Sequence, residues 1–248
     1  MKIKILSGKK YLHADFSEPA DISMPLRESA GQVNAWNAPP LKIEPVRHGS
    51  WVGEVSRGAS INFRNISFNP HGNGTHTECV GHITKKKYSI NRCLSRFLFY
   101  AELITVKPLP DGGDKIITRA ILQKKITGKK PEALVIRTLP NGNAKKTRQY
   151  SGTNPPYFHH EAATFMRRNG IQHLLTDLPS VDKEDDGGKL LAHRAFWDYP
   201  GKTRTHCTIT ELVYVPDHLP DGSYLLDLQV ANFENDASPS RPVLYRLY

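Results

Sequence analysis

The chain has 248 residues, of which 38% are hydrophobic and 9% aromatic, as expected of a globular protein with one substantial core. Its apolar runs are shorter than the ~20 residues that cross a bilayer, and its first ten residues lack the apolar run of a signal peptide, so we expect a cytoplasmic protein with no membrane partner. The net charge is +10, but the basic residues stand in short, separated groups without interleaved aromatic residues, which argues for solvated surface and against a nucleic-acid partner.

Short apolar runs rich in β-branched residues predict nine strands. In chain order these are Ile3–Leu6, Ile22–Leu26, Leu41–Val46, Ser60–Phe68, Leu98–Val106, Leu134–Thr138, Leu174–Thr176, Thr208–Val215 and Tyr224–Val230. Two segments with helical periodicity, Pro156–Asn169 and Lys189–Trp197, predict helices that end at Gly170 and before Pro200. No repeat or linker divides residues 1–248, so we expect one α/β domain with a mixed sheet and few helices.

Three cysteines, Cys79, Cys93 and Cys207, are an odd number without CxxC spacing. This argues against a disulfide framework and against a thiolate zinc site. We expect all three to be buried structural thiols.

The most informative segment is Gly72-Asn-Gly-Thr-His76-Thr-Glu78-Cys-Val-Gly-His82. In an extended backbone, side chains two residues apart point to the same face, so His76, Glu78 and His82 can project together. Imidazole and carboxylate groups are ligands for zinc, iron and manganese, and a third group on that face can move protons. A polar strand end with satisfied histidines is the alternative.

This segment resembles the signature of the cyclase superfamily of metal-dependent hydrolases, which includes bacterial kynurenine formamidases and isatin hydrolases. The signature is His-x-Gly-Thr-His-x-Asp-x-Pro-x-His, whose first two His and Asp bind metal and whose last His acts in catalysis. Here Gly72 stands at the first His position, Glu78 at the Asp position and Val80 at the Pro position.

Further matches extend the resemblance from about Asp21 to the C-terminus. The family has a first strand like Asp21–Leu26 and an Asp-x-Pro-Ser-x-Asp segment like Asp177–Asp182. A metal-binding His and a metal-binding Glu follow in the family, and these positions are His193 and Glu211 here. The resemblance also implies the swivelling β/β/α fold.

The resemblance therefore implies a metal site formed by His76, Glu78, His193 and Glu211, with His82 and Glu78 in catalytic roles. Because Gly72 lacks a side chain, we expect one divalent ion, zinc or manganese, and we expect Gly72→His to strengthen metal binding. His71 is an alternative ligand, but a shift of one residue turns a strand side chain to the other face unless a bulge intervenes.

The function implied is hydrolysis of a small amide, lactam or lactone by metal-activated water, with His82 as general acid and base. By family, the substrate is an aryl formamide such as N-formylkynurenine, which belongs to tryptophan catabolism, and the enzyme is a homodimer or higher homo-oligomer. The alternative is a non-catalytic binding protein that kept the cyclase fold with an incomplete metal site.

Other polar residues carry weaker hypotheses. His159 and His160 are ordinary polar residues at a helix start, and His206 is either a partner of the site or outside it. Asp177 and Asp182 are expected to hold the turn at Pro179. Trp36 either walls the substrate pocket or packs as an ordinary core residue.

Overall fold

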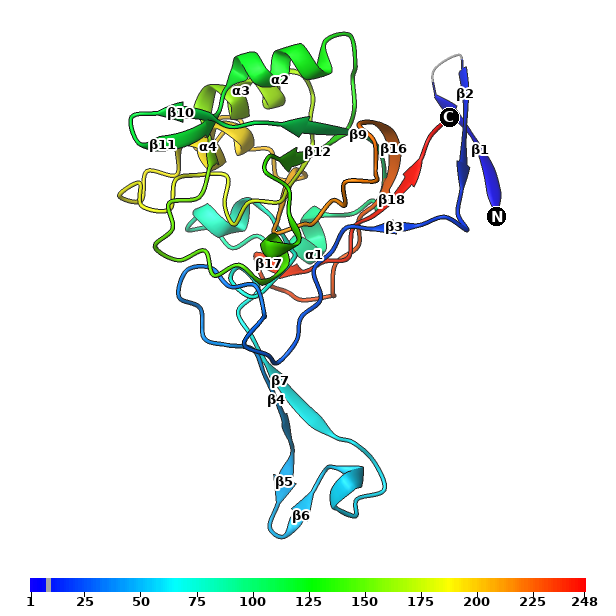
Figure 1. The fold of residues 1–248 in the computed structure, drawn as a ribbon, viewed down its shortest axis with the longest axis vertical. Coiled ribbons are helices and arrows are strands. Elements are labelled where there is room, and N and C mark those ends of the chain that lie inside the picture. The colour runs from blue at the N-terminus through cyan, green and yellow to red at the C-terminus, as the bar shows by residue number, and fades with distance from the viewer. Residues whose placement is uncertain (8–9) are drawn as a thin grey trace.

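A nine-stranded sheet forms the centre of the molecule in a computed structural model that describes residues 1–7 and 10–248 (Figure 1). Four neighbouring strands in its middle run parallel, and the strands on both sides pair antiparallel, which confirms the expected mixed sheet. In spatial order the strands are β17 (Ala237–Pro239), β8 (His76–Glu78), β15 (Thr208–Glu211), β14 (His173–Thr176), β12 (Ala133–Thr138), β9 (Leu98–Val106), β16 (Gly222–Asp227), β18 (Val243–Arg246) and β3 (Ala20–Asp21).

Both faces of the central strands are buried, because their side chains alternate between two apolar layers. On β12, for example, Leu134 and Ile136 face one layer while Ala133 and Val135 face the other. The first layer is covered by the helices α2 (Arg119–Ile126), α3 (His160–Arg168) and α4 (Leu191–Trp197) (Figure 1). The second layer is closed by the short helix α1 (Ile90–Cys93) and by side chains of β16 and β18.

Smaller elements surround this sheet. A hairpin of β1 (Lys2–Ser7) and β2 (Lys10–Asp15) lies beside β18. A three-stranded sheet and two 3-10 helices complete the body, namely β10 (Leu109–Asp111), β11 (Asp114–Ile117), β13 (Tyr157–Phe158), η2 (Val80–Ile83) and η3 (Asn143–Thr147).

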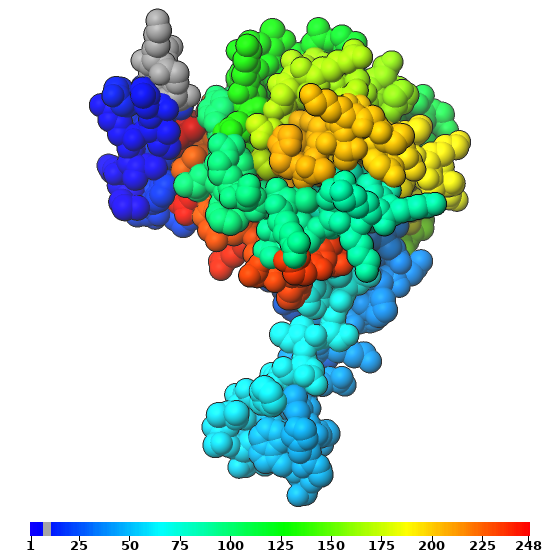
Figure 2. All heavy atoms as spheres, turned by 180° about the vertical axis from the view of Figure 1, so that it is seen from behind, coloured from blue at the N-terminus to red at the C-terminus, as the bar shows by residue number. Residues whose placement is uncertain are grey.

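Residues 42–67 form an arm that projects away from the body (Figures 1 and 2). Its stem pairs β4 (Lys42–Pro45) with β7 (Arg64–Ser67), and its tip pairs β5 (Arg47–His48) with β6 (Trp51–Val52) before the 3-10 turn η1 (Val55–Arg57). The arm leads directly into the His71–His82 segment.

Several of the predicted elements are corrected by the structure. The strand predicted from Ser60 begins only at Arg64, and the one predicted to reach Val230 ends at Asp227. Residues Ile22–Leu26 are not a strand, since the ladder with β18 ends at Asp21. The helix predicted from Pro156 begins at His160, because Tyr157 and Phe158 pair with β11. The strand predicted to reach Val215 ends at Glu211, because Leu212 has a left-handed backbone with φ 54°.

Two of the three thiols and most of the basic residues follow the expectation. Cys79 and Cys207 are buried, Cys93 is partly exposed, and all three are free. Lys145 is not solvated surface, since it is 5% exposed and its Nζ lies 2.7 Å from the buried carboxylate of Asp177. None of the helices in the described ranges has the length and apolar composition needed to span a membrane.

Candidate metal centre

The edge of the sheet places two carboxylates and one imidazole on the helix-covered face. His76 and Glu78 of β8 point to one side, while Thr77 between them points to the other and contacts Thr210 at 2.8 Å. Glu211 of β15 stands directly opposite His76 in the antiparallel register, so the two side chains share a face. His76 Nε2 and Glu211 Oε2 are 3.4 Å apart, and His76, Glu78 and Glu211 are all buried.

His193 enters this cluster from the first turn of α4. Its Nε2 lies 3.1 Å from Glu78 Oε1 and 4.0 Å from Glu211 Oε1. The carboxylate of Asp182 accepts the backbone amides of Ala192 and His193 at 2.7 and 3.1 Å, and it contacts His193 Nδ1 at 2.6 Å. Asp182 therefore caps the start of α4 and orients the imidazole of His193. The sequence predicts only that it holds the turn at Pro179.

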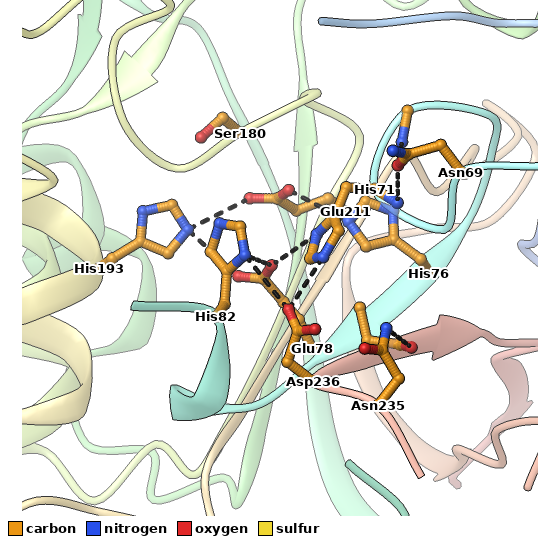
Figure 3. A network of polar contacts seen from close by, with 12 residues as sticks. Asn69, His71, His76, Glu78, His82, Ser180, His193, Glu211, Asn235 and Asp236 are labelled. Carbon is orange, nitrogen blue, oxygen red and sulfur yellow. Dashed lines mark hydrogen bonds and ion pairs between the residues drawn. The ribbon is translucent and has the colours of Figure 1, made fainter. Parts of the chain in front are cut away.

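His71 also belongs to the cluster, although the alternation of strand side chains argued against it. Residues 70–74 form turns and bends, so that alternation does not apply. The side-chain oxygen of Asn69 accepts the amides of His71 and Gly72 at 2.9 and 3.1 Å and holds this turn. His71 Nδ1 consequently lies 3.2 Å from Glu78 Oε2 (Figure 3).

Gly72 lies against another part of the chain and has no room for a side chain. A Cβ atom there would overlap the Cβ of Ala38 and approach the carbonyl oxygen of Ala35 to 2.8 Å. This crowding argues against the expectation that Gly72→His adds a ligand. His71, one position earlier, places an imidazole in the cluster, 3.2 Å from Glu78 Oε2.

His82 and Asp236 complete the cluster on its solvent side. His82 lies on η2, its side chain is 31% exposed, and its Nδ1 is 3.7 Å from Glu78 Oε2 and 3.4 Å from Asp236 Oδ2. Asp236, which directly precedes β17, also contacts His71 Nε2 at 3.0 Å (Figure 3). The site therefore grades from a fully buried floor to a partly open rim.

The charges of the cluster stabilise each other. Burial by itself lowers the pKa of His193, but hydrogen bonds to Asp182 and Glu78 outweigh it and raise that pKa to about 10. Burial likewise disfavours protonated His71, yet Asp236 and Glu78 raise its pKa to about 10. Burial would raise the pKa of Glu78, but the neighbouring His82 and His193 hold it well below its usual range. A metal that binds these imidazoles must therefore displace protons.

The donor set fits a divalent metal ion. Within the described part of the chain, His76 Nε2 and Glu78 Oε2 are buried and have no well-aligned hydrogen-bond partner, although Glu211 Oε2 and His71 Nδ1 lie 3.4 and 3.2 Å away, and both atoms face the cluster. An unpaired buried acceptor is costly unless something else occupies its lone pair. Within the described residues, three groups offer ligand atoms close enough to share an ion. Glu78 belongs to two of them, with His71 and His76 and with His82 and His193, and the third consists of His71, His82 and Asp236.

A pocket of about 310 Å³ opens onto the cluster. His71, His82, His193 and Glu211 line it, together with Trp36, which is 40% exposed. Trp36 is thus a pocket residue and not an ordinary core tryptophan. A larger groove of about 810 Å³ adjoins the cluster through Asp236 and contains His206.

The remaining candidate residues lie outside the cluster. His159 and His160 begin α3, where His159 accepts the amide of Glu161. Asp177 is buried and bound to Thr138 and Lys145, so it does not face the metal centre.

Asp236 was missed by the sequence reasoning, because it stands in a polar segment with no spacing relation to the other site residues. Its only signal is the pairing of β17 with β8, which brings it next to Cys79 and becomes visible only in the folded chain.

Known proteins are similar to this chain in sequence and in fold. A model of the Cyclase family matches residues 20–183. Kynurenine formamidase from Bacillus cytotoxicus is 30% identical over 231 residues, which cover 92% of this chain and 97% of that protein.

Two solved structures resemble the fold at low sequence identity. One is a potential metal-dependent hydrolase with cyclase activity, with a TM-score of 0.67, 15% identity and coverage of 92% of this chain and 97% of that one. The other is isatin hydrolase A from Labrenzia aggregata, with a TM-score of 0.63, 16% identity and coverage of 92% and 93%. The chain therefore belongs to the cyclase superfamily of metal-dependent hydrolases.

Proposed function

We propose that the protein hydrolyses a small amide, with an aryl formamide as its substrate, at a divalent metal centre formed by His71, His76, Glu78, His193 and Glu211. The observation that carries this proposal is the set of buried imidazole and carboxylate atoms that face one point, two of them without a well-aligned hydrogen-bond partner in the described chain. Imidazole and carboxylate ligands suit zinc, with manganese as the second choice.

The expected limit to one ion rested on the imidazole missing at position 72. With His71 in the cluster, Glu78 is shared between two groups of donors, so the site offers ligands for one or two ions. We propose at least one zinc ion per chain.

The proposed role of each residue follows from whether it is buried or exposed in the site. When bound, a divalent ion lowers the pKa of water from ~15.7 to ~7 and polarises a carbonyl group. His82, on the open rim, takes a proton from the attacking water and returns it to the leaving nitrogen. Glu78 holds the imidazoles around it and, as a carboxylate at neutral pH, keeps the floor of the site negative. Trp36 offers the pocket an aromatic wall for an aryl group.

Two further proposals concern the setting of the enzyme. The substrate class, shared with the kynurenine formamidase relatives, supports a role in tryptophan catabolism. The free thiols Cys79, Cys93 and Cys207 suit the reducing cytoplasm.

We also propose that the protein is a homo-oligomer in which the arm of one copy packs on a second copy. A two-stranded hairpin has no core of its own and is marginally stable in water. Several large apolar side chains of the arm are exposed by 39–60%: Trp51, Val55, Ile61, Phe63 and Ile66. A twofold arrangement would bury both arms at once.

The metal and the activity can be tested together. The parent protein, His76→Ala and Glu211→Gln are loaded with zinc or manganese, the metal content is measured by mass spectrometry, and aryl formamide hydrolysis is followed by the release of the aryl amine. We expect metal and turnover in the parent and a loss of both in the variants. His159→Ala, which changes an exposed imidazole outside the cluster, should behave like the parent.

The non-catalytic alternative makes a different prediction. A loaded parent that binds metal but releases no amine from aryl formamides, other amides, lactams or lactones would support it. A parent that takes up no metal would overturn the proposed site itself.

A further inference from the structure

Two imidazoles of the metal centre share one arrangement. His76 places Nε2 toward the cluster, while its Nδ1 contacts the carbonyl oxygen of Gly74 at 3.0 Å. His193 places Nε2 toward the cluster, while its Nδ1 contacts Asp182 at 2.6 Å. In each ring a fixed acceptor takes the outer N–H, so the inner nitrogen keeps its lone pair for a metal.

His71 has the same arrangement with the two nitrogens exchanged. Its Nδ1 faces Glu78 Oε2 at 3.2 Å, and its Nε2 faces Asp236 Oδ2 at 3.0 Å. We infer that Asp236 is the positioning residue of His71: its carboxylate accepts the Nε2–H of His71, selects that tautomer and turns Nδ1 toward the metal. This inference rests on the metal site proposed above.

The backbone holds Asp236 in place for this role. Its carbonyl oxygen accepts the amide of Cys79 at 2.9 Å, directly after the β8 residues of the site, and the carbonyl oxygen of Asn235 accepts the amide of Ile90 at 2.8 Å. Gly81 permits the close approach, because a Cβ atom there would overlap the carbonyl oxygen of Tyr88 and lie 3.1 Å from the Cβ of Asp236. The carboxylate is thus anchored to the same strand that carries His76 and Glu78.

Asp236 also stands near His82, whose Nδ1 is 3.4 Å from the same carboxylate oxygen. The contact with His71 is shorter, and His71 is the more buried of the two histidines, since its side chain is 21% exposed and that of His82 is 31% exposed. We therefore assign the positioning role to the pair Asp236–His71.

A double-mutant cycle tests the assignment with metal affinity as the readout. Zinc affinity is measured by competition with a chelator for the parent, Asp236→Ala, His71→Ala and the double variant. Removing an outer partner of a metal-bound His typically weakens binding ~10–100-fold. We expect that loss for Asp236→Ala in the parent background and no additional loss in the His71→Ala background, because the carboxylate acts through that ring.

Asp236→Asn separates positioning from direct ligation. The amide oxygen of Asn can still accept the Nε2–H, whereas a neutral amide is a poor zinc ligand, so we expect Asp236→Asn to retain most of the affinity that Asp236→Ala loses. The visible spectrum of the cobalt-loaded protein should change in Asp236→Ala and resemble the parent in Asp236→Asn. Asp221→Asn is the matched control, since Asp221 is a similarly exposed carboxylate that contacts Thr105 and Arg137.

Three results would overturn the inference: equal losses for Asp236→Ala in both backgrounds, an Asp236→Asn variant as weak as Asp236→Ala, or unchanged affinity in both Asp236 variants. Thermal unfolding of the metal-free proteins shows whether each variant is folded. If the parent itself bound no zinc, the proposed function would fail, and that outcome is distinct from all three.

Discussion

The imidazole of His71 reaches the metal centre from a turn whose backbone packs tightly against residues 35–38. We predict that His71→Ala lowers zinc affinity, while Gly72→His lowers stability without adding a ligand. Overpacking of this kind costs about 1–3 kcal/mol of unfolding free energy. Urea unfolding of the metal-free proteins measures the cost.

Gly142→His is the control for that substitution, because Gly142 is exposed and a Cβ atom there meets nothing within 4 Å. It should be close to neutral. A Gly72→His protein that is as stable as the parent and binds zinc more tightly would contradict the assignment of His71.

The position of His82 on the rim predicts a separation of metal binding from turnover. His82→Ala should keep nearly the parent's zinc content and lose turnover by ~10²–10⁴-fold, the usual contribution of a general acid and base. Metal content and turnover are measured on the same preparation. Should the zinc be lost together with the activity, His82 would be a ligand, as its place in the Glu78–His82–His193 group allows.

A buried histidine outside the candidate metal centre predicts how stability depends on pH. Burial lowers the pKa of His173 to about 3, and its Nδ1 contacts Thr208 at 2.8 Å. Between pH 6.5 and pH 3 the unfolded chain therefore binds a proton that the folded chain excludes. Above pH 6.5, His173 does not change the free energy of unfolding. Below that pH, its titration lowers the free energy of unfolding by up to about 1.4 kcal/mol for each pH unit.

His173→Asn, which keeps a polar group near Thr208, should reduce that slope. Urea unfolding of the metal-free protein from pH 6.5 to 4.5 compares the two slopes. Equal slopes would show that His173 is protonated in the folded state.

At the scale of elements, the register of the sheet edge explains why part of the site was predictable. Period-two spacing placed His76 and Glu78 on one face, and the antiparallel pairing of β15 with β8 brought Glu211 opposite His76. The central strands were predictable for a similar reason, since β9 spans the expected Leu98–Val106 and β12 differs by one residue. Strands buried on both faces have continuous apolar runs that few other structures share.

The remaining elements depend on contacts that local sequence does not reveal. Tyr157 and Phe158 lie in a strand because β11 pairs with them, although helical periodicity includes them. His71 is only an alternative ligand from sequence, because strand alternation points it away, whereas in the structure Asn69 holds a turn at this place. The helix α2 was not predicted. Its one start signal in the sequence is the N-cap residue Thr118, whose side chain accepts the amide of Ile121.

At the scale of the whole molecule, the exposed apolar side chains of the arm predict self-association. The parent protein should sediment as a dimer or larger oligomer at micromolar concentration, and Trp51→Ser with Phe63→Ser should shift it toward the monomer while metal binding persists. Leu109→Ser, on the body at 46% exposure, is the control and should leave the oligomer intact. A monomeric parent would contradict the proposed association.

The arm also provides one place where the chain can be cut without taking the body of the protein apart. A protease that cuts near η1 would divide the chain into two fragments. The first fragment supplies β3 and the Met24 amide, which donates to Thr75 at 2.7 Å. The second carries His71 and the later side chains of the proposed metal site. The two fragments would remain one particle, held by the sheet, and would separate only on a denaturing gel. Because a copy packed on the arm would shield it, the rate of cleavage should fall as protein concentration rises, so limited digestion reports association without any substitution in the chain.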